Sequence, residues 1–165
     1  MRLTLIRHGE AGDDAPRDAL RSLTLRGRAS VQRVGRALRR RGGDFTAVVS
    51  SPLVRALQTA EIVAAEVGFG GRLLVSEALI PEAAVERALD LVRSLANEDS
   101  VALVAHEPIL SMLAGELTGK NRYPALRKAE VLRFRLRDGL DGEAELRWRI
   151  DPDTGAREAG QDHDD

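Results

Sequence analysis

The chain has 165 residues, of which 43% are hydrophobic, and this suits one folded domain better than two domains or a disordered chain. It contains no cysteine, which excludes disulfides, thiol nucleophiles and cysteine-ligated metal sites. The net charge of −1 hides a mildly basic body, because the segment after Ile150 carries six acidic residues and one basic residue. Such a body suits an anionic ligand, whether small or polymeric.

The first apolar segment, residues 3–6, lies between Arg2 and Arg7 and predicts a short buried strand. It is too short for the apolar core of a signal peptide. No other segment approaches the roughly 20 apolar residues that span a bilayer. We therefore expect a cytoplasmic protein that does not cross a membrane.

A loop and a long helix follow. Residues 13–22 are polar and contain Pro16, which indicates a loop. Apolar residues then recur at helical spacing, which predicts a helix over residues 25–41 that Gly42 and Gly43 end. Residues 45–49 predict the second strand.

The middle of the chain repeats this alternation. Ser51 as N-cap and Pro52 in the first turn predict a helix that ends at Gly68, and residues 73–75 predict a strand. Pro81 is expected to open the next helix. The buried stripe of that helix would be Val85, Leu89, Val92 and Leu95.

Residues 101–105 are uniformly apolar, as in a strand covered on both faces, and His106-Glu107-Pro108 leads into another helix. Nearer the C-terminus the apolar period changes to two, which predicts a hairpin whose turn is formed by residues 138–142. Residues after Pro152 are expected to be disordered. The expected organisation is one domain over residues 1–150 and an acidic tail over residues 151–165.

Strands that alternate with helices predict an α/β fold. We expect a three-layer sandwich with a mostly parallel central sheet flanked by helices, and the C-terminal β-hairpin at the edge of the sheet.

Chemically active side chains follow three of the predicted strands. Arg7 and His8 follow the first strand, Arg55 follows the second, and His106 follows the apolar strand at 101–105. In such folds ligands bind at the carboxyl ends of the strands. We therefore expect these four side chains to meet at one edge of the sheet.

This set of residues suits phosphoryl transfer. A neutral imidazole is a good nucleophile toward phosphorus, and guanidinium groups match the oxygens of a phosphoryl group in transfer. Helix N-termini after Ser51 and Glu107 would add backbone N–H donors, and Gly9 would leave room for a phosphate to approach the backbone. We expect no metal and no cofactor, since positive charge is already in place.

Four segments of the chain resemble landmarks of the histidine phosphatase superfamily, also called phosphoglycerate-mutase-like, in order and in spacing. They are Leu5-Ile6-Arg7-His8-Gly9-Glu10-Ala11, Arg21-Ser22-Leu23-Thr24-Leu25-Arg26-Gly27, Ser50-Ser51-Pro52-Leu53-Val54-Arg55-Ala56-Leu57-Gln58-Thr59-Ala60 and Val104-Ala105-His106-Glu107-Pro108. The last departs from the family pattern, because Gly more often stands where this chain has Ala105. The resemblance covers about residues 1 to 120. The short length and the Arg-x-Leu-Thr-x-x-Gly segment most resemble the small bacterial branch that includes the phosphohistidine phosphatase of phosphorelay signalling.

The resemblance implies that His8 is the nucleophile and becomes phosphorylated, that Arg7, Arg55 and His106 hold the phosphate, and that water then hydrolyses the phosphohistidine. It also suggests Glu77 as the general acid, with Glu82 as second candidate. The chain lacks the Gly-aromatic-acidic continuation of the mutase-like members. Since phosphohistidine depends less on an enzyme acid than a phosphate ester does, we expect a phosphohistidine-bearing protein as substrate.

Other functions stay open at this stage. One is a small-molecule phosphatase that acts on esters such as sugar or nucleotide phosphates. Another is a nucleic-acid-binding module that uses the alternating arginines of the predicted hairpin, although the aromatic stacking platform of a single-strand binder is absent. A third is a scaffold that binds phosphate without turnover, which the complete residue set disfavours. The sequence does not determine the oligomeric state.

Overall fold

A mixed β-sheet runs through the whole molecule. The computed structural model describes residues 1–137 and 144–160, and within these residues the sheet has seven strands in the order β3-β2-β4-β1-β5-β6-β7. Strands β3, β2, β4 and β1 are parallel, and β5, β6 and β7 continue the sheet in antiparallel pairing. The strands are β1 (Arg2–Arg7), β2 (Ala47–Ser50), β3 (Leu73–Val75), β4 (Ser100–Ala105), β5 (Val131–Arg135), β6 (Glu145–Ile150) and β7 (Arg157–Ala159).

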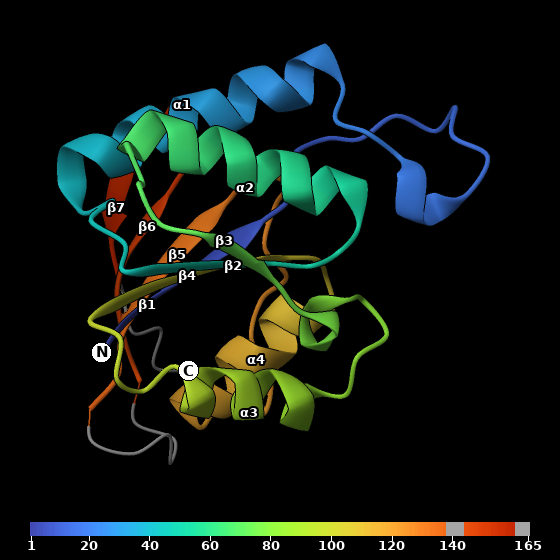
Figure 1. Ribbon diagram of the computed structural model, residues 1–165. Helices are drawn as coiled ribbons and strands as arrows, with labels where there is room; N and C mark the ends of the chain where they lie inside the picture. Colours follow the sequence, from blue (N-terminus) through green and yellow to red (C-terminus); the bar gives the residue numbers. More distant parts are fainter. Residues whose placement is uncertain (138–143, 161–165) are drawn as a thin grey trace.

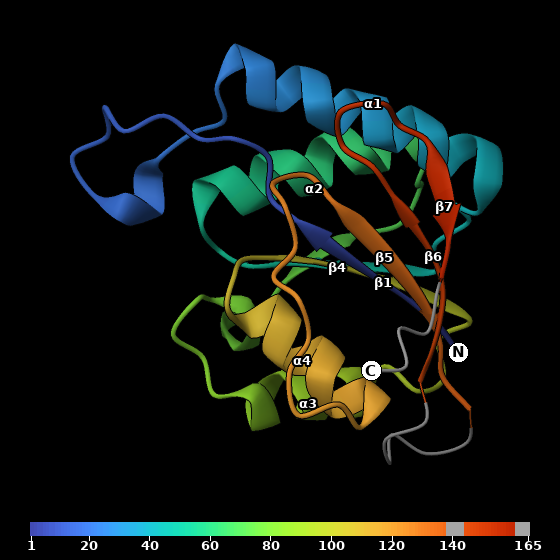
Figure 2. The same cartoon turned by 180° about the vertical axis from the view of Figure 1, so that it is seen from behind.

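Helices cover both faces of this sheet (Figures 1 and 2). The helices are α1 (Leu25–Arg41), α2 (Val54–Val67), α3 (Val85–Ser94) and α4 (Ile109–Thr118), with short 3-10 helices at Asp18–Leu20 and Glu77–Leu79. Helices α1 and α2 pack on one face and α3 and α4 on the other. The predicted three-layer sandwich is confirmed.

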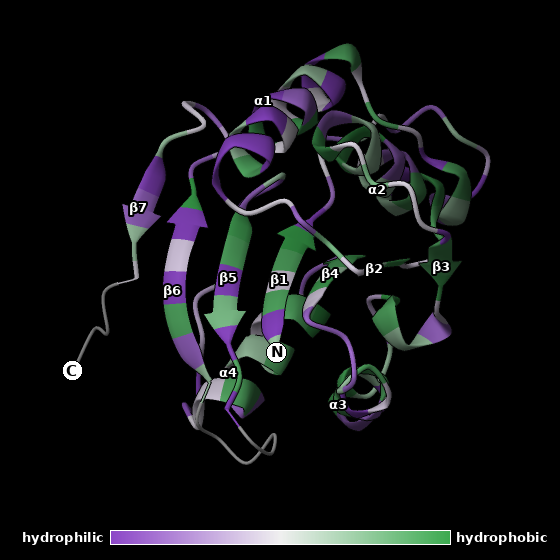
Figure 3. Ribbon diagram, turned by 60° about the vertical axis from the view of Figure 1, so that its left-hand side comes forward, coloured by the Kyte–Doolittle hydropathy of each residue, from purple (hydrophilic) through white to green (hydrophobic). Residues whose placement is uncertain are grey.

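The two cores follow from the alternation of side chains along each strand. On β1, Leu5 packs in the core beneath α3 and α4, whereas the next residue, Ile6, packs beneath α1 and α2. All of β4 is buried because it lies inside the sheet between β2 and β1. Hydrophobic residues accordingly dominate the central strands, and hydrophilic ones become frequent toward β6 and β7 (Figure 3).

Helix ends are decided by local sequence where capping residues are strong. The Thr24 hydroxyl accepts a hydrogen bond from the Gly27 amide at 2.9 Å, so α1 begins where the pattern predicted. Gly42 and Gly68 end α1 and α2 with positive φ angles of 127° and 73°. Both ends agree with the prediction. Strand β2 begins two residues later than expected.

The next helix begins later than the expected start at Pro81. Helix α3 starts at Val85, because a turn closed by the Ala83 amide and the Ile80 carbonyl precedes it. Within the helix, Val85 and Val92 are buried as expected, but Leu89 is only partly covered. The delay leaves residues 80–84 as a loop at the edge of the sheet.

The predicted hairpin is present, but its arginines do not all share one face. In the β5–β6 register Arg133 lies opposite Trp148 and Leu132 lies opposite Arg149, so Arg133 and Arg149 are on opposite faces of the sheet. Arg133 is buried, lies over the rings of Phe45 and Trp148, and donates a hydrogen bond to the Gly42 carbonyl. Within the described residues, the five alternating arginines of the hairpin therefore do not form the single exposed face expected for a nucleic-acid-binding module. The predicted turn at 138–142 lies outside the described residues.

The segment expected to be a disordered tail continues the sheet instead. Residues Arg157–Ala159 form β7 beside β6. Asp151 accepts a hydrogen bond from Arg127, and the Pro152 carbonyl accepts one from Arg33 at 2.9 Å. The partners in each of these contacts lie far apart in the sequence. Acidic composition alone could not indicate them and therefore suggested disorder. Among the described residues, no helix is long and apolar enough to cross a membrane.

Candidate active site

The residues that follow the parallel strands β1, β2 and β4 lie together at one edge of the sheet. Arg7 pairs with Ala105 and Ser50 with Val104, so β1, β2 and β4 end at nearly the same level. A cavity of about 350 Å³ opens there. Its lining residues are Arg7, His8, Ala11, Asp18, Arg21, Arg55, Pro81, Glu82, His106, Glu107 and Lys128. The four side chains predicted to meet are therefore brought together.

The geometry of His8 leaves one ring nitrogen free for chemistry. Its Nδ1 lies 2.6 Å from the Gly9 carbonyl oxygen, which can only accept, so Nδ1 carries the hydrogen. The lone pair of the neutral ring is then on Nε2. Burial is the main cause that lowers the pKa of His8 to about 4. The hydrogen bond to Gly9 acts in the opposite direction, and the positive charges of Arg55, Arg7 and Lys128 lower the pKa further. The ring is thus neutral and nucleophilic near neutral pH.

His106 presents its ring 5.0 Å from that of His8, measured between centroids. Its Nε2 lies 2.8 Å from the Ser51 hydroxyl oxygen, which also accepts from the Leu53 amide at 3.3 Å. A hydroxyl that accepts from the Leu53 amide can still donate its proton to Nε2, and in that arrangement the neutral His106 ring carries its hydrogen on Nδ1. Burial is the largest cause that lowers the pKa of His106 to about 3, followed by His8 and Arg55. His106 is therefore a neutral donor.

Ser51 has a different role from the predicted helix cap. Helix α2 begins at Val54, and its N-terminal flanking residue is Leu53, which has no side-chain hydrogen bond to the helix. The Ser51 hydroxyl is engaged by His106 instead. The same hydroxyl also accepts from the Leu53 amide, but its partner His106 lies 55 positions away in sequence, and only the folded chain shows this contact.

Three buried nitrogen atoms at this edge have no hydrogen-bond partner among the described residues. They are Nε of Arg7, Nε of Arg55 and Nδ1 of His106. Buried donors are normally satisfied, and an unpaired one carries a free-energy cost. A bound oxyanion would supply acceptors to this set. The unpaired donors of these three lining residues therefore suit an anionic ligand.

Asp18 and Arg21 line the cavity, although the sequence indicated a role in the site for neither of them and marked Arg21 only as the start of a family-like segment. The Asp18 carbonyl and carboxylate accept from the Arg55 guanidinium at 2.9 and 3.1 Å, and Arg21 binds the same carboxylate at 3.0 Å. Burial opposes ionisation of Asp18, but Arg55 and Arg21 outweigh it and lower the pKa of this carboxyl. Asp18 therefore orients Arg55. No local pattern in a polar loop could have indicated this contact.

Gly9 is required by helix packing, and the room that it leaves for a phosphate stays a prediction. A Cβ at Gly9 would lie 2.7 Å from Cγ2 of Val31 and 3.0 Å from the Gly27 carbonyl oxygen, both on α1. The Gly9 amide donates to the Thr59 hydroxyl at 3.1 Å, and this hydroxyl donates to the Arg55 carbonyl. Thr59, which the sequence placed in a family-like segment without a role of its own, thus ties the backbone next to His8 to the helix that carries Arg55.

The two candidate acids are placed differently. Glu82 lines the cavity, whereas Glu77 is not among its lining residues. Glu77 begins the short 3-10 helix that precedes the loop at residues 80–84. Because α3 starts at Val85 and not at Pro81, that loop carries Glu82 to the cavity.

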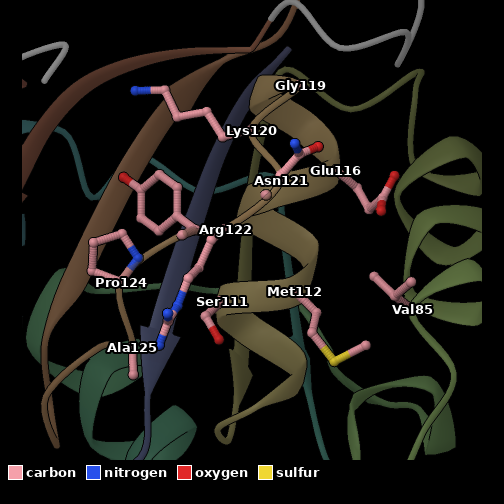
Figure 4. Close-up of a pocket in the computed structure, with 12 residues that line it drawn as sticks. Val85, Ser111, Met112, Glu116, Gly119, Lys120, Asn121, Arg122, Pro124 and Ala125 are labelled. Carbon is pink, nitrogen blue, oxygen red and sulfur yellow. The ribbon is translucent and has the colours of Figure 1, made fainter. Parts of the chain in front are cut away.

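A second, larger hollow of about 660 Å³ lies elsewhere, between α4, the segment that follows it and Val85 (Figure 4). It includes Met112, Lys120 and Arg122 but neither His8 nor His106. Among the described residues, no group of three or more histidine, aspartate or glutamate side chains is placed to hold a metal ion. Of these two hollows, the cavity around His8 is the one lined by histidine side chains.

Paired imidazoles and guanidinium groups at the carboxyl edge of an α/β sheet define an enzyme of the phosphoryl-transfer class. Comparisons with known proteins agree. Residues 3–80 match the family described as histidine phosphatase superfamily (branch 1). An uncharacterized protein of Picosynechococcus is 35% identical over 114 residues, which cover 67% of this chain and 68% of that protein.

The phosphohistidine phosphatase SixA of Escherichia coli is 28% identical over 158 residues, which cover 92% of this chain and 94% of SixA. A solved structure of SixA complexed with tungstate superposes with a TM-score of 0.85 at 26% identity, covering 92% of this chain and 97% of that one. The alpha-ribazole phosphatase from Shigella flexneri shares the fold, with a TM-score of 0.72 at 20% identity over 89% of this chain and 95% of that one. The chain belongs to the histidine phosphatase superfamily and is a hydrolase of the phosphatase class.

Proposed function

We propose that this phosphatase removes phosphoryl groups from phosphohistidine side chains of proteins, and that His8 carries the phosphoryl group between the two halves of the reaction. The observation that carries the proposal is the buried, neutral His8 ring with a free Nε2, set among the unpaired donors of Arg7, Arg55 and His106. The similarity to SixA over nearly the whole chain supports the choice of substrate. The tungstate that the solved structure of SixA contains is a tetrahedral oxyanion like phosphate.

The proposed reaction has two steps. In the first, the lone pair of His8 Nε2 attacks phosphorus, the bond from phosphorus to the substrate nitrogen breaks, and that nitrogen takes up a proton. In the second, water attacks phosphorus and loses a proton, which replaces the one taken up in the first step, the bond to Nε2 breaks, and inorganic phosphate leaves. Arg7, Arg55 and His106 donate to the phosphoryl oxygens in both steps, where charge is spread over them. The Gly9 carbonyl holds the His8 ring in the reactive tautomer throughout.

Possible substrates differ in how strongly they need an enzyme acid to supply the proton of the first step. A departing imidazole is a better leaving group than an alkoxide, so phosphohistidine needs less help from an enzyme acid. Glu82 is the lining carboxylate that we propose could help, since Asp18 is bound to two arginines and Glu107 accepts hydrogen bonds from the Leu126 amide and the Ser111 hydroxyl. Glu82 is exposed and has no hydrogen bond or ion pair with the described part of the chain.

A direct comparison of substrates tests the proposal. The enzyme is incubated briefly with a ³²P-phosphohistidine protein and, separately, with a panel of alkyl and aryl phosphates. We expect faster release of phosphate from phosphohistidine, an acid-labile phosphoenzyme in the wild type, and inhibition by vanadate but not by EDTA. The His8→Ala variant should fold but form no phosphoenzyme. Full turnover by that variant would exclude the mechanism, and much faster ester turnover would identify a small-molecule phosphatase.

Two matched carboxylate variants test the proton donor. Loss of a general acid slows esters with poor leaving groups most, by about 10² or more. Glu82→Gln should therefore reduce turnover of an alkyl phosphate more than that of 4-nitrophenyl phosphate, and Glu77→Gln should change neither. Equal effects of the two variants would remove Glu82 from this role.

A further inference from the structure

Lys128 lies on a segment that is tied directly to the catalytic strand. This segment, residues 126–130, connects to β5. The Leu126 carbonyl accepts a hydrogen bond from the Arg7 guanidinium, and the Ala129 amide donates to the His8 carbonyl at 3.0 Å. The Arg7 amide donates to the Glu130 carbonyl at 3.1 Å. The backbone on both sides of Lys128 is thus held in place relative to His8.

The internal structure of the segment separates its two cations. The Arg127 amide donates to the buried Glu130 carboxylate at 2.7 Å, and the Glu130 amide donates back to the Arg127 carbonyl at 3.0 Å. Ala129 adopts a φ of 62°, in the left-handed region that residues with a Cβ rarely adopt. The side chain of Arg127 binds Asp151 and Asp153, while Lys128 lines the cavity around His8.

Lys128 differs from the other cations of the cavity in having no partner. It forms no hydrogen bond or ion pair with any residue in the ranges 1–137 and 144–160, whereas Arg55 and Arg21 both bind Asp18. Its charge nevertheless reaches His8, because it contributes to lowering the pKa of that ring. A free ammonium group at an anion site, on a backbone fixed to the nucleophile, is available to a ligand.

We propose that Lys128 is a further substrate-binding residue, whose ammonium group contacts the oxygens of the phosphoryl group as it moves to His8. This inference rests on the proposed function of the same cavity. The buried guanidinium of Arg55 is held in one orientation by Asp18, whereas a lysine ammonium group has a long flexible stem and three donors. Lys128 can therefore follow the oxygens while phosphorus moves from the substrate nitrogen to Nε2 of His8.

The chain offers a built-in control, because Lys120 and Lys128 are its only lysines. Lys120 lines the other hollow, on the segment that follows α4 (Figure 4). Reductive methylation with ¹³C-formaldehyde labels both lysines and keeps their charge. Lys128→Arg and Lys120→Arg variants assign the two signals and separate them from the N-terminal amine.

Vanadate is then titrated into the labelled enzyme while its inhibition is measured under the same conditions. We expect the Lys128 signal to shift with the same midpoint as inhibition, and the Lys120 signal to stay in place. Vanadate that inhibits without moving the Lys128 signal would overturn the inference but leave the proposed function intact. Absence of both inhibition and phosphohistidine turnover would contradict the proposed function itself.

Kinetics give an independent measurement. Loss of one charge-assisted hydrogen bond at a partly open site should reduce kcat/KM for the phosphohistidine protein, and raise the vanadate inhibition constant, by about tenfold in Lys128→Ala. Lys128→Arg should restore both quantities to within about threefold, since the charge returns. Lys120→Ala should match the wild type. Equal values for Lys128→Ala and wild type, with normal folding, would refute the role of Lys128.

Discussion

Acidification should destabilise this protein through its two buried histidines. Burial lowers the pKa of His8 to about 4 and that of His106 to about 3, whereas both rings titrate near their ordinary value of about 6.5 in the unfolded chain. Below that value the unfolded chain takes up protons that the folded protein cannot. Stability from these groups is therefore complete above about pH 6.5 and is lost as the pH falls toward 4.

The size of the effect follows from the same shifts. Between its unfolded and folded pKa values, each ring lowers the free energy of unfolding by about 1.4 kcal/mol for each pH unit of acidification. From about pH 7.5 to pH 5 the contribution of His8 amounts to about 2 kcal/mol, and that of His106 is similar. Replacing His8 by Asn removes one of these contributions while the carboxylates elsewhere in the chain titrate unchanged. When the pH falls over this range, the free energy of unfolding should therefore decrease by about 2 kcal/mol less in His8→Asn than in the wild type.

Urea unfolding of wild type and His8→Asn measures this difference. The single tryptophan, Trp148, is buried in the core and reports unfolding by fluorescence. The buffer must contain no phosphate or sulfate, because an oxyanion bound only to the folded state would add stability. A free-energy difference between the two proteins that does not change with pH would show that His8 is not a desolvated, neutral ring.

Two further predictions concern the scaffold of the site. A Cβ at Gly27 would lie 2.1 Å from a backbone carbonyl oxygen, so Gly27→Ala should destabilise the fold by about 1 to 3 kcal/mol in thermal or urea unfolding. Gly70→Ala, which meets nothing within 4 Å, serves as the control and should not lower stability. Removal of residues 151–165 deletes β7 and should lower the melting temperature, whereas removal of residues 161–165 alone should not. Equal melting temperatures for the two truncations would mean that β7 contributes nothing to stability.

Local sequence determined much of the architecture. The Thr24 cap and the glycines after α1 and α2 fix helix ends through contacts within a few residues, so these ends were predictable. The apolar run of β4 indicated a strand covered on both faces, and alternation indicated the hairpin. The meeting of His8 with His106 followed from a general rule, because parallel strands bring their carboxyl ends to one edge.

Only the tertiary structure decided which contacts each residue makes there. Ser51 binds His106 and does not cap α2, and Gly9 is small because α1 packs against it. Asp18 reaches Arg55 across 37 positions of chain. Such partners depend on how elements distant in the sequence pack together, and hydrophobic periodicity does not indicate this packing. Side-chain type and strand order therefore determined the chemistry available at this site, whereas packing determined which atoms remain free to perform it.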